Sequence, residues 1–222
     1  MQAVAHVHTC YPDKFGIPRQ SGLVPSACAR LVFEPPFRNA DAIRGLEGFS
    51  HIWLIWQFSE NVDAGWHFTV RPPRLGGNTR VGVFATRSPF RPNPIGLSVV
   101  KLERIELHPT EGPVLHLSGI DMLDGTPILD IKPYVPTADC IPQASAGFTS
   151  VPFSVLSVHI PDDLMKKIPN SSRQLVIETL SQDPRPQYQS DPARVYGLVI
   201  EKLEIKFQVN DGTLRVVAVD QL

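Results

Sequence analysis

The chain has 222 residues, of which 42% are hydrophobic and 19% are charged, and its formal net charge is −1. These values are typical of a globular protein that buries a core, and they exclude a disordered or collagen-like chain. The length favours one large unit with a smaller one attached, since domains usually contain about 100 to 150 residues. The 22 prolines, about twice the usual share of ~5%, disfavour long helices and favour strands and ordered loops.

The expected elements of the first unit are mostly short strands. They fall at residues 2–9, 51–58, 80–86, 97–107, 114–119 and 128–134, and residues 39–45 form a helical turn capped by Asn39. Short strands at near-regular spacing, without long helices between them, predict an antiparallel barrel or sandwich. We expect Trp53, Trp56 and Trp66 to be core or interface residues and not base-stacking platforms, because indoles within apolar runs are usually buried.

A second unit is expected after a Pro/Ser/Gly-rich connection at residues 139–152, which divides the chain into domains 1–142 and 150–222. It contains a helix at 171–182, capped by Ser171 or Ser172, and two strands at 203–209 and 213–219 joined by an Asn-Asp-Gly turn. The prediction is therefore a mainly β protein: a β-barrel followed by a small α+β domain.

Charge is distributed unevenly. No Asp or Glu occurs between Asp63 and Glu103, an interval that contains Arg71, Arg74, Arg80, Arg87, Arg91 and Lys101. A basic face of this kind suits phosphate contacts, although a solvated loop with scattered arginines is the alternative.

The cysteines Cys10, Cys28 and Cys140 are odd in number and widely spaced, which argues against a disulfide framework or a CxxC metal site and favours a reducing compartment. Residues 1–10 lack a leader pattern, and the most apolar window, 51–58, is too short to cross a bilayer. We therefore predict a cytoplasmic protein with no membrane contact. His6 and His8 share a strand face, but no further ligand is positioned for zinc, so no metal is predicted.

The most unusual segment is 82–98, where Pro89, Pro92 and Pro94 fix the backbone before any ligand binds. Arg87 and Arg91 offer guanidinium groups for a carboxylate or phosphate, and Asn93 offers an amide. A stiff barrel corner with surface arginines is the alternative. In the turn at 121–127, the Asp-Gly pair accounts for the turn without any function. No Rossmann, P-loop, zincin or hydrolase signature occurs.

Segments from both units resemble the TsaA-like, or TrmO (YaeB), family of tRNA methyltransferases. They are 17–20 (IPRQ), 41–51 (DAIRGLEGFSH), 71–78 (RPPRLGGN), 81–88 (VGVFATRS), 90–96 (FRPNPIG), 124–127 (DGTP), 130–134 (DIKPY) and 183–186 (DPRP). The resemblance implies a homodimer that binds S-adenosyl-L-methionine near the subunit interface. The implied reaction is N6-methylation of N6-threonylcarbamoyladenosine at position 37 in the anticodon loop of tRNA, with tRNA for threonine expected first.

By the same resemblance, cofactor contacts fall on Pro18, Arg19, Gln20, Ser59, Glu60, Arg87, Leu97, Met122, Leu123, Asp124 and Gly125. Many relatives carry His-Gln at the position of Ser59 and Glu60, so the contact there departs from the family pattern. The donor carboxylate is expected on Arg19 or Arg87 and its ammonium on Asp124.

The catalytic candidates are Asp121 or Asp124 as base and Asn93 as a positioning group. Candidate substrate-binding residues are Arg71, Arg74, Arg91, Asn93 and Arg185. Two rival hypotheses are a non-catalytic RNA-binding barrel and a methyltransferase that acts on another acceptor.

Overall fold

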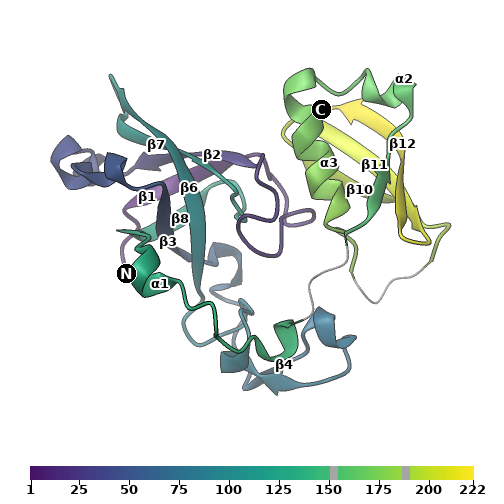
Figure 1. The fold of residues 1–222 in the computed structure, drawn as a ribbon, viewed down its shortest axis with the longest axis horizontal. Coiled ribbons are helices and arrows are strands. Elements are labelled where there is room, and N and C mark those ends of the chain that lie inside the picture. Colours follow the sequence, from purple (N-terminus) through teal and green to yellow (C-terminus); the bar gives the residue numbers. More distant parts are fainter. Residues whose placement is uncertain (151–154, 187–190) are drawn as a thin grey trace.

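The structure is a computed structural model that describes residues 1–150, 155–186 and 191–222. Two units lie side by side, a barrel and a smaller α/β unit that carries the C-terminus (Figure 1). The barrel strands are β1 (Ala5–Thr9), β2 (Cys28–Phe33), β3 (His51–Gln57), β6 (Ile95–His108), β7 (Gly112–Ser118) and β8 (Thr126–Pro133). The expected barrel is confirmed.

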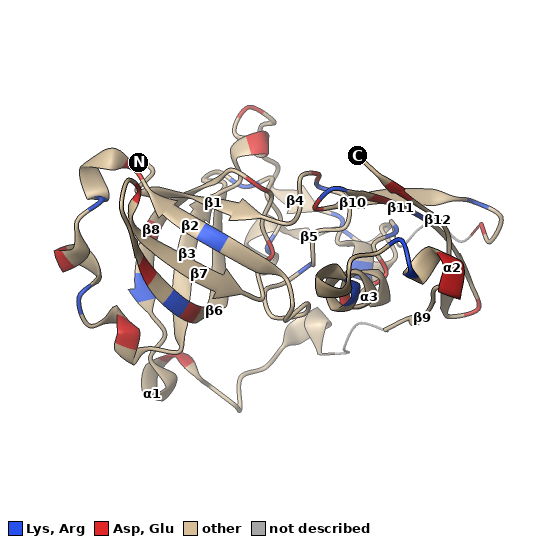
Figure 2. Cartoon of the chain, turned by 90° about the horizontal axis from the view of Figure 1, so that it is seen from above, with Lys and Arg blue, Asp and Glu red and all other residues tan. Residues whose placement is uncertain are grey.

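The barrel closes in the order β1-β2-β7-β6-β3-β8, with every neighbouring pair antiparallel. Its strands alternate between core and outer side chains: on β3, Ile52, Leu54 and Trp56 are buried and the residues between them are half-buried. The outer face of β6 carries alternating acidic and basic side chains (Figure 2), paired as Lys101–Glu103 and Arg104–Glu106.

A long excursion, residues 58–94, leaves the barrel at the end of β3 and returns as β6. It contains the two-stranded ribbon of β4 (Thr69–Val70) and β5 (Val81–Gly82), drawn below the barrel in Figure 1. The expected strand at 80–86 is wrong beyond Val81–Gly82. A 3-10 turn, Val83–Ala85, follows β5 and turns the buried Val83 inward while Phe84 stays exposed.

The second unit is a four-stranded sheet in the order β10-β11-β12-β9, with helices against it. Its strands are β9 (Ser157–His159), β10 (Tyr196–Ile200), β11 (Leu203–Asn210) and β12 (Thr213–Gln221), and its helices are α2 (Asp162–Met165) and α3 (Arg173–Ser181). A third short helix, α1 (Pro136–Asp139), follows the barrel and ends where the predicted connection begins. Residues 151 and 152 of that connection lie outside the described residues.

Helix α3 matches the expected helix, but the predicted serine cap is wrong. A 3-10 turn, Asn170–Ser172, leads into the helix, and the Ser172 hydroxyl donates a hydrogen bond to Glu201 instead of accepting one from the helix. Trp66 is not a core residue, since it is 43% exposed on the excursion, and an interface position for it stays a prediction. Trp56 is buried, and Trp53 is half-buried and donates to Asp139.

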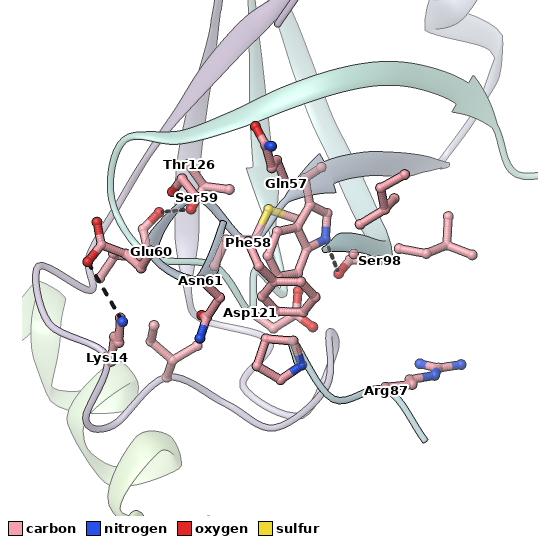
Figure 3. Close-up of a pocket in the computed structure, with 18 of the residues that line it drawn as sticks. Lys14, Gln57, Phe58, Ser59, Glu60, Asn61, Arg87, Ser98, Asp121 and Thr126 are labelled. Atoms are coloured by element: carbon pink, nitrogen blue, oxygen red, sulfur yellow. Dashed lines mark hydrogen bonds and ion pairs between the residues drawn. The ribbon is translucent and has the colours of Figure 1, made fainter. Parts of the chain in front are cut away.

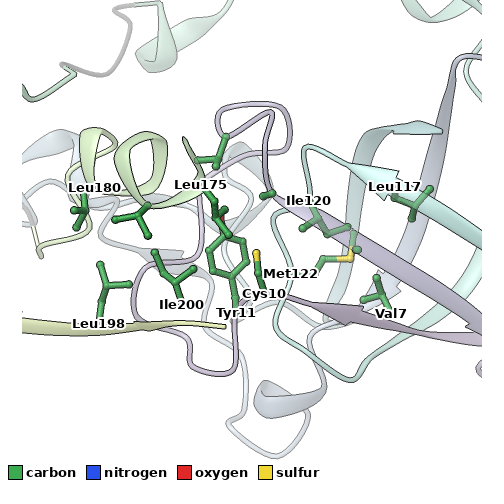
Figure 4. Close-up of a cluster of buried hydrophobic side chains, with 14 of the residues drawn as sticks. Val7, Cys10, Tyr11, Leu117, Ile120, Met122, Leu175, Leu180, Leu198 and Ile200 are labelled. Carbon is green, nitrogen blue, oxygen red and sulfur yellow. The ribbon is translucent and has the colours of Figure 1, made fainter. Parts of the chain in front are cut away.

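The two units share one hydrophobic core (Figure 4). Tyr11, in the loop after β1, is fully buried between the barrel and α3, and its hydroxyl lies 3.3 Å from the Thr179 hydroxyl. Burial raises the pKa of Tyr11 well above its ordinary value. A backbone bond from the Glu201 amide to the Cys10 carbonyl oxygen, 2.8 Å long, also joins the units. The contact between them is therefore apolar and continuous.

Three further features follow from the described residues. No helix among them is long and apolar enough to cross a membrane. No cluster of His, Cys, Asp and Glu in these ranges is arranged to hold a metal ion; His6 contacts Glu34, and His8 lies near Asp124. All three cysteines are free thiols, and burial raises the pKa of Cys10 to about 12.

Candidate functional site

A cavity of about 470 Å³ opens at the end of the barrel where β3 ends and β6 and β8 begin (Figure 3). This volume is in the range of small-molecule sites, about 300 to 1,000 Å³. Four separate segments meet there: the loop after β1, the end of β3 with the start of the excursion, the proline-rich loop with the start of β6, and the turn between β7 and β8. The antiparallel barrel brings these distant segments to one edge.

Most of the cofactor residues expected from the sequence line this one cavity. They are Pro18, Arg19, Gln20, Ser59, Glu60, Arg87, Leu97, Met122 and Leu123, and the candidates Asp121 and Arg91 line it too. The exceptions among the cofactor residues are Asp124 and Gly125, which are exposed and absent from the lining.

Asp124 and Gly125 instead form the turn that supports the lining residues before them. The Asp124 carboxylate accepts a 2.8 Å hydrogen bond from the Thr9 amide, and its own amide donates to the Tyr11 carbonyl oxygen at 2.9 Å. Gly125 adopts a φ of 76°, a conformation that favours glycine. The geometry therefore fixes the backbone at Asp121–Leu123 against β1.

One wall of the cavity is built from a tryptophan packed on a glycine. Trp56 and Gly96 pair across β3 and β6, and a Cβ added to Gly96 would lie 2.2 Å from Trp56 Cε2. A register irregularity at Ile55/Trp56 in the β3–β8 pairing lies at the same place, as is common next to active sites. The Trp56 indole donates a 3.1 Å hydrogen bond to the buried Ser98 hydroxyl, which fixes the ring.

Asp121 is the one carboxylate of the cavity whose pKa is raised among the described residues. Burial raises its pKa from 3.8 to about 6, and hydrogen bonds from Ser98 and from backbone amides, with the charge of Arg87, oppose that rise. Its Oδ1 atom is buried and has no hydrogen-bond partner. A desolvated carboxylate in a cavity is a functional-site signal.

Two arginines of the cavity are positioned by different parts of the chain, Arg87 by the barrel and Arg19 by the second unit. Arg87 donates to the Gln20 side chain. Arg19 reaches the second unit, where its Nη2 atom donates to the Asp183 carbonyl oxygen at 3.1 Å and lies 3.5 Å from that of Arg185. Burial lowers the pKa of Arg19 from its ordinary value, against the effect of Asp183. The second unit thus helps to position a residue of the barrel cavity.

The substrate candidates other than Arg91 lie outside the cavity lining. Arg74 donates to the Thr149 carbonyl oxygen at 2.8 Å, Arg185 forms an ion pair with Asp183 at 2.8 Å, and Arg71 and Asn93 are exposed on the excursion. Arg91 donates to the Thr86 carbonyl oxygen at 3.0 Å and so braces its own loop. Arg91 is therefore the one substrate candidate that lines the cavity among the described residues.

Sequence reasoning missed several lining residues. Lys14 pairs with Glu60, Nζ to Oε2 at 3.7 Å. The rings of Phe58 and Trp56 contact each other in a tilted arrangement, with centroids 4.2 Å apart and an angle of 58° between the planes. A shallower depression shares Lys14, Glu60 and Leu123 with the cavity and extends to β10 of the second unit. Only the ends of the apolar strand at 51–58 could have indicated Phe58; no motif marks Lys14.

The residues fit S-adenosylmethionine by their chemistry. Trp56, Phe58 and Ile95 offer apolar surface for the donor, and Arg87 offers a partner for its carboxylate.

Comparison with known proteins agrees with this site. Residues 6–140 match the model of the tRNA-methyltransferase O N-terminal domain, and residues 151–222 match that of the TrmO C-terminal domain. The tRNA (adenine(37)-N6)-methyltransferase of Escherichia coli is 40% identical over 228 residues, 99% of this chain and 97% of that protein. A putative S-adenosylmethionine-dependent methyltransferase of Pseudomonas aeruginosa, RcsF, is 42% identical over 91% of this chain and 89% of that one.

Among solved structures, the crystal structure of TrmO from Pseudomonas aeruginosa superimposes with a TM-score of 0.81 at 36% identity, covering 99% of this chain and 95% of that one. The matches extend over both units, and they confirm the resemblance stated from the sequence motifs. The chain belongs to the tRNA-methyltransferase O family.

Proposed function

We propose that this chain transfers a methyl group from S-adenosyl-L-methionine to N6 of N6-threonylcarbamoyladenosine at position 37 of tRNA, with tRNA for threonine as the first expected substrate. The observation that carries the proposal is the cavity at the barrel end, where arginine side chains, an apolar wall and a desolvated carboxylate meet beside a segment free of acidic residues. Family membership supplies the reaction class.

S-adenosylmethionine, when bound, supplies an electrophilic methyl carbon on a sulfonium. Arg87, or Arg19 with it, holds the donor carboxylate, since a guanidinium pairs with a carboxylate through two parallel hydrogen bonds. Trp56 and Met122 exclude water from the donor, and the turn at Asp124 and Gly125 fixes the backbone that lies against it. These residues would hold S-adenosylmethionine in the cavity, where it would supply the methyl group.

The acceptor reaches the cavity from the excursion. Arg91 lines the cavity, and Arg71 and Arg74 belong to the same excursion. This interval of the sequence has no Asp or Glu between Asp63 and Glu103, so the phosphates of an anticodon loop would meet no acidic residue of that segment. Arg185, next to Asp183, provides a further basic group where the second unit approaches Arg19. We assign these side chains to tRNA and Asn93 to the orientation of the modified base.

A homodimer is supported by an aromatic patch on the same excursion, defined as Trp66, Phe68, Phe84 and Phe90. Phe68 and Phe84 are 80% and 77% exposed, and the rings of Trp66 and Phe68 contact each other with centroids 4.6 Å apart. Contiguous exposed aromatic side chains mark interaction surfaces. A second copy seated on the patch would border the donor cavity, since Arg87 and Pro89 come from the same loop.

We place the protein in the cytoplasm, because its proposed substrate is tRNA and its three thiols are free. Phe68→Ser with Phe84→Ser should convert the dimer to a monomer in sedimentation experiments, and a dimer that persists would move the interface elsewhere.

The decisive experiment incubates the purified protein with S-adenosylmethionine and tRNA that does or does not carry the threonylcarbamoyl group, followed by mass spectrometry of nucleosides. We expect methylated threonylcarbamoyladenosine only with the modified tRNA. Donor binding without methyl transfer to either tRNA would keep the cofactor and move the acceptor elsewhere. No donor binding by calorimetry would favour a non-catalytic RNA-binding barrel.

A further inference from the structure

Asp121 combines three properties that no other acidic residue of the cavity has. It lines the cavity, it is largely removed from solvent, and its Oδ1 atom is buried without a hydrogen-bond partner. An unpaired buried polar atom costs about 1 to 3 kcal/mol, so a fold retains one where it has a use. Figure 3 shows Asp121 in the cavity, near Ser98 and Phe58.

The neighbours of Asp121 fix its orientation. Ser98 accepts the Trp56 indole hydrogen at 3.1 Å, so its own hydroxyl hydrogen is directed away from Trp56 and donates toward the Asp121 carboxylate. Backbone amides of Asp121 and Ser21 contribute as well. These contacts are enough to hold the carboxylate in place, but they leave one oxygen unsatisfied.

The proposed acceptor needs a group that removes a proton. Its N6 atom carries one hydrogen and is acylated as a urea, so its lone pair is delocalised and the nitrogen is a poor nucleophile in its neutral form. Once the methyl group is transferred, the N6 hydrogen must leave. A positioned base that takes it in the transition state contributes about 10²- to 10⁴-fold.

Resting on the proposed function, we infer that Asp121 is the general base of the reaction. The Asp121 carboxylate takes the N6 hydrogen as the bond between N6 and the methyl carbon forms. The bond from that carbon to sulfur breaks, and its electron pair stays on sulfur. The positive charge of the sulfonium and the negative charge of the carboxylate disappear together, so the step leaves no separated charges in the cavity.

The other acidic groups are less suited to this role. The Asp124 carboxylate is outside the cavity lining and accepts the Thr9 amide, and Glu60 is exposed and pairs with Lys14. The remaining charged side chains that line the cavity are Arg19, Arg87 and Arg91. Arginine stays protonated at every pH of interest, so among these groups Asp121 is the one whose titration sets activity between pH 5 and 7.

The test compares wild type with Asp121→Asn, and Asp130→Asn serves as matched control, since Asp130 is an exposed carboxylate on β8 outside the cavity. Single-turnover methyl transfer at saturating donor is measured from pH 5 to 8 with modified tRNA, and donor affinity is measured by calorimetry. We expect Asp121→Asn to lose at least 100-fold in rate while the dissociation constant of the donor changes less than threefold. The wild-type rate should rise tenfold per pH unit below about 6, and this dependence should vanish in Asp121→Asn.

Two further measurements do not rely on activity of the intact site. The infrared carboxyl band of the donor-free protein, taken as the difference between wild type and Asp121→Asn, should disappear as the pH rises through about 6. In Asp121→Ala, added formate should restore part of the rate, because it can occupy the vacated space and accept the proton.

The inference is overturned if Asp121→Asn retains its rate, or if it loses donor affinity while its rate at saturating donor is unchanged, since Asp121 would then bind the donor cation. Failure of the wild type itself to methylate either tRNA would instead refute the proposed function. These outcomes are distinguishable because donor binding and wild-type turnover are measured separately.

Discussion

Replacing Asp121 by asparagine should stabilise the protein, and the gain should depend on pH. Burial raises the pKa of Asp121 from 3.8 to about 6, so the folded state holds its proton more tightly than the unfolded state does. The stability associated with that proton is fully present below pH 3.8 and is lost as the pH rises through 6. Compared with a carboxyl group of unperturbed pKa, a rise of this size lowers the free energy of unfolding by about 3 kcal/mol at pH 8 and by about half of that at pH 5. Asparagine keeps the shape of the side chain and carries no charge at either pH.

Urea denaturation of both proteins at pH 5 and pH 8 measures the effect. We expect Asp121→Asn to have a higher free energy of unfolding than wild type, and this difference should be about 1.5 kcal/mol larger at pH 8 than at pH 5. Asp130→Asn, at an exposed position, should stay within about 0.5 kcal/mol of wild type at both values. An equal gain at the two pH values, or none at either, would refute the argument that burial holds the pKa of Asp121 high.

Three other predictions concern the cavity and its rim. Gly96→Ala should displace Trp56, lower the free energy of unfolding by about 1 to 3 kcal/mol and weaken donor binding. Gly82→Ala should have none of these effects, since an added Cβ there meets nothing within 4 Å. Urea denaturation measures the stability of the two variants, and calorimetry measures their donor affinity. Arg87→Ala should weaken donor binding by calorimetry, and Arg91→Ala should leave donor affinity intact while lowering methyl transfer; if both properties fall together in both variants, the division of roles is incorrect. The affinity for tRNA should fall steeply between 50 and 200 mM salt in filter-binding assays, since counterions are released from each phosphate contact, and a flat response would contradict the basic rim.

Much of the barrel could be predicted from the sequence because its strands show the alternation that a barrel interior requires. In the barrel, β6 alternates between buried and outer residues from Ile95 to Leu102, and the apolar run and its length indicate β3; β11 shows the same alternation in the second unit. The predicted strand at 80–86 is too long because its length depends on tertiary structure. Val81–Gly82 pairs only with the two residues of β4, and Val83 then turns inward. The length of this strand is limited by its two-residue partner, which local sequence propensity does not reveal.

The sequence predicted most residues of the candidate site, but not their positions relative to one another. The family motifs indicated most of the lining, but the sequence left Asp121 and Asp124 as alternative candidates for the base. The two were separated only by contacts that are distant in sequence: the Thr9 amide binds one carboxylate, and the barrel edge at Ser98 desolvates the other. Lys14 lies in a loop without a motif, and only the fold places it opposite Glu60.

The contact between Arg19 and the second unit couples the donor cavity to the position of that unit. Arg19 lies in a barrel loop, but its guanidinium is fixed by carbonyl oxygens of Asp183 and Arg185. A ligand that shifts the second unit therefore alters the wall of the cavity. By thermodynamic reciprocity, if tRNA bound to the second unit changes donor affinity by some factor, the donor changes tRNA affinity by the same factor. The size of this coupling is measured by determining the affinity for each ligand in the presence of the other.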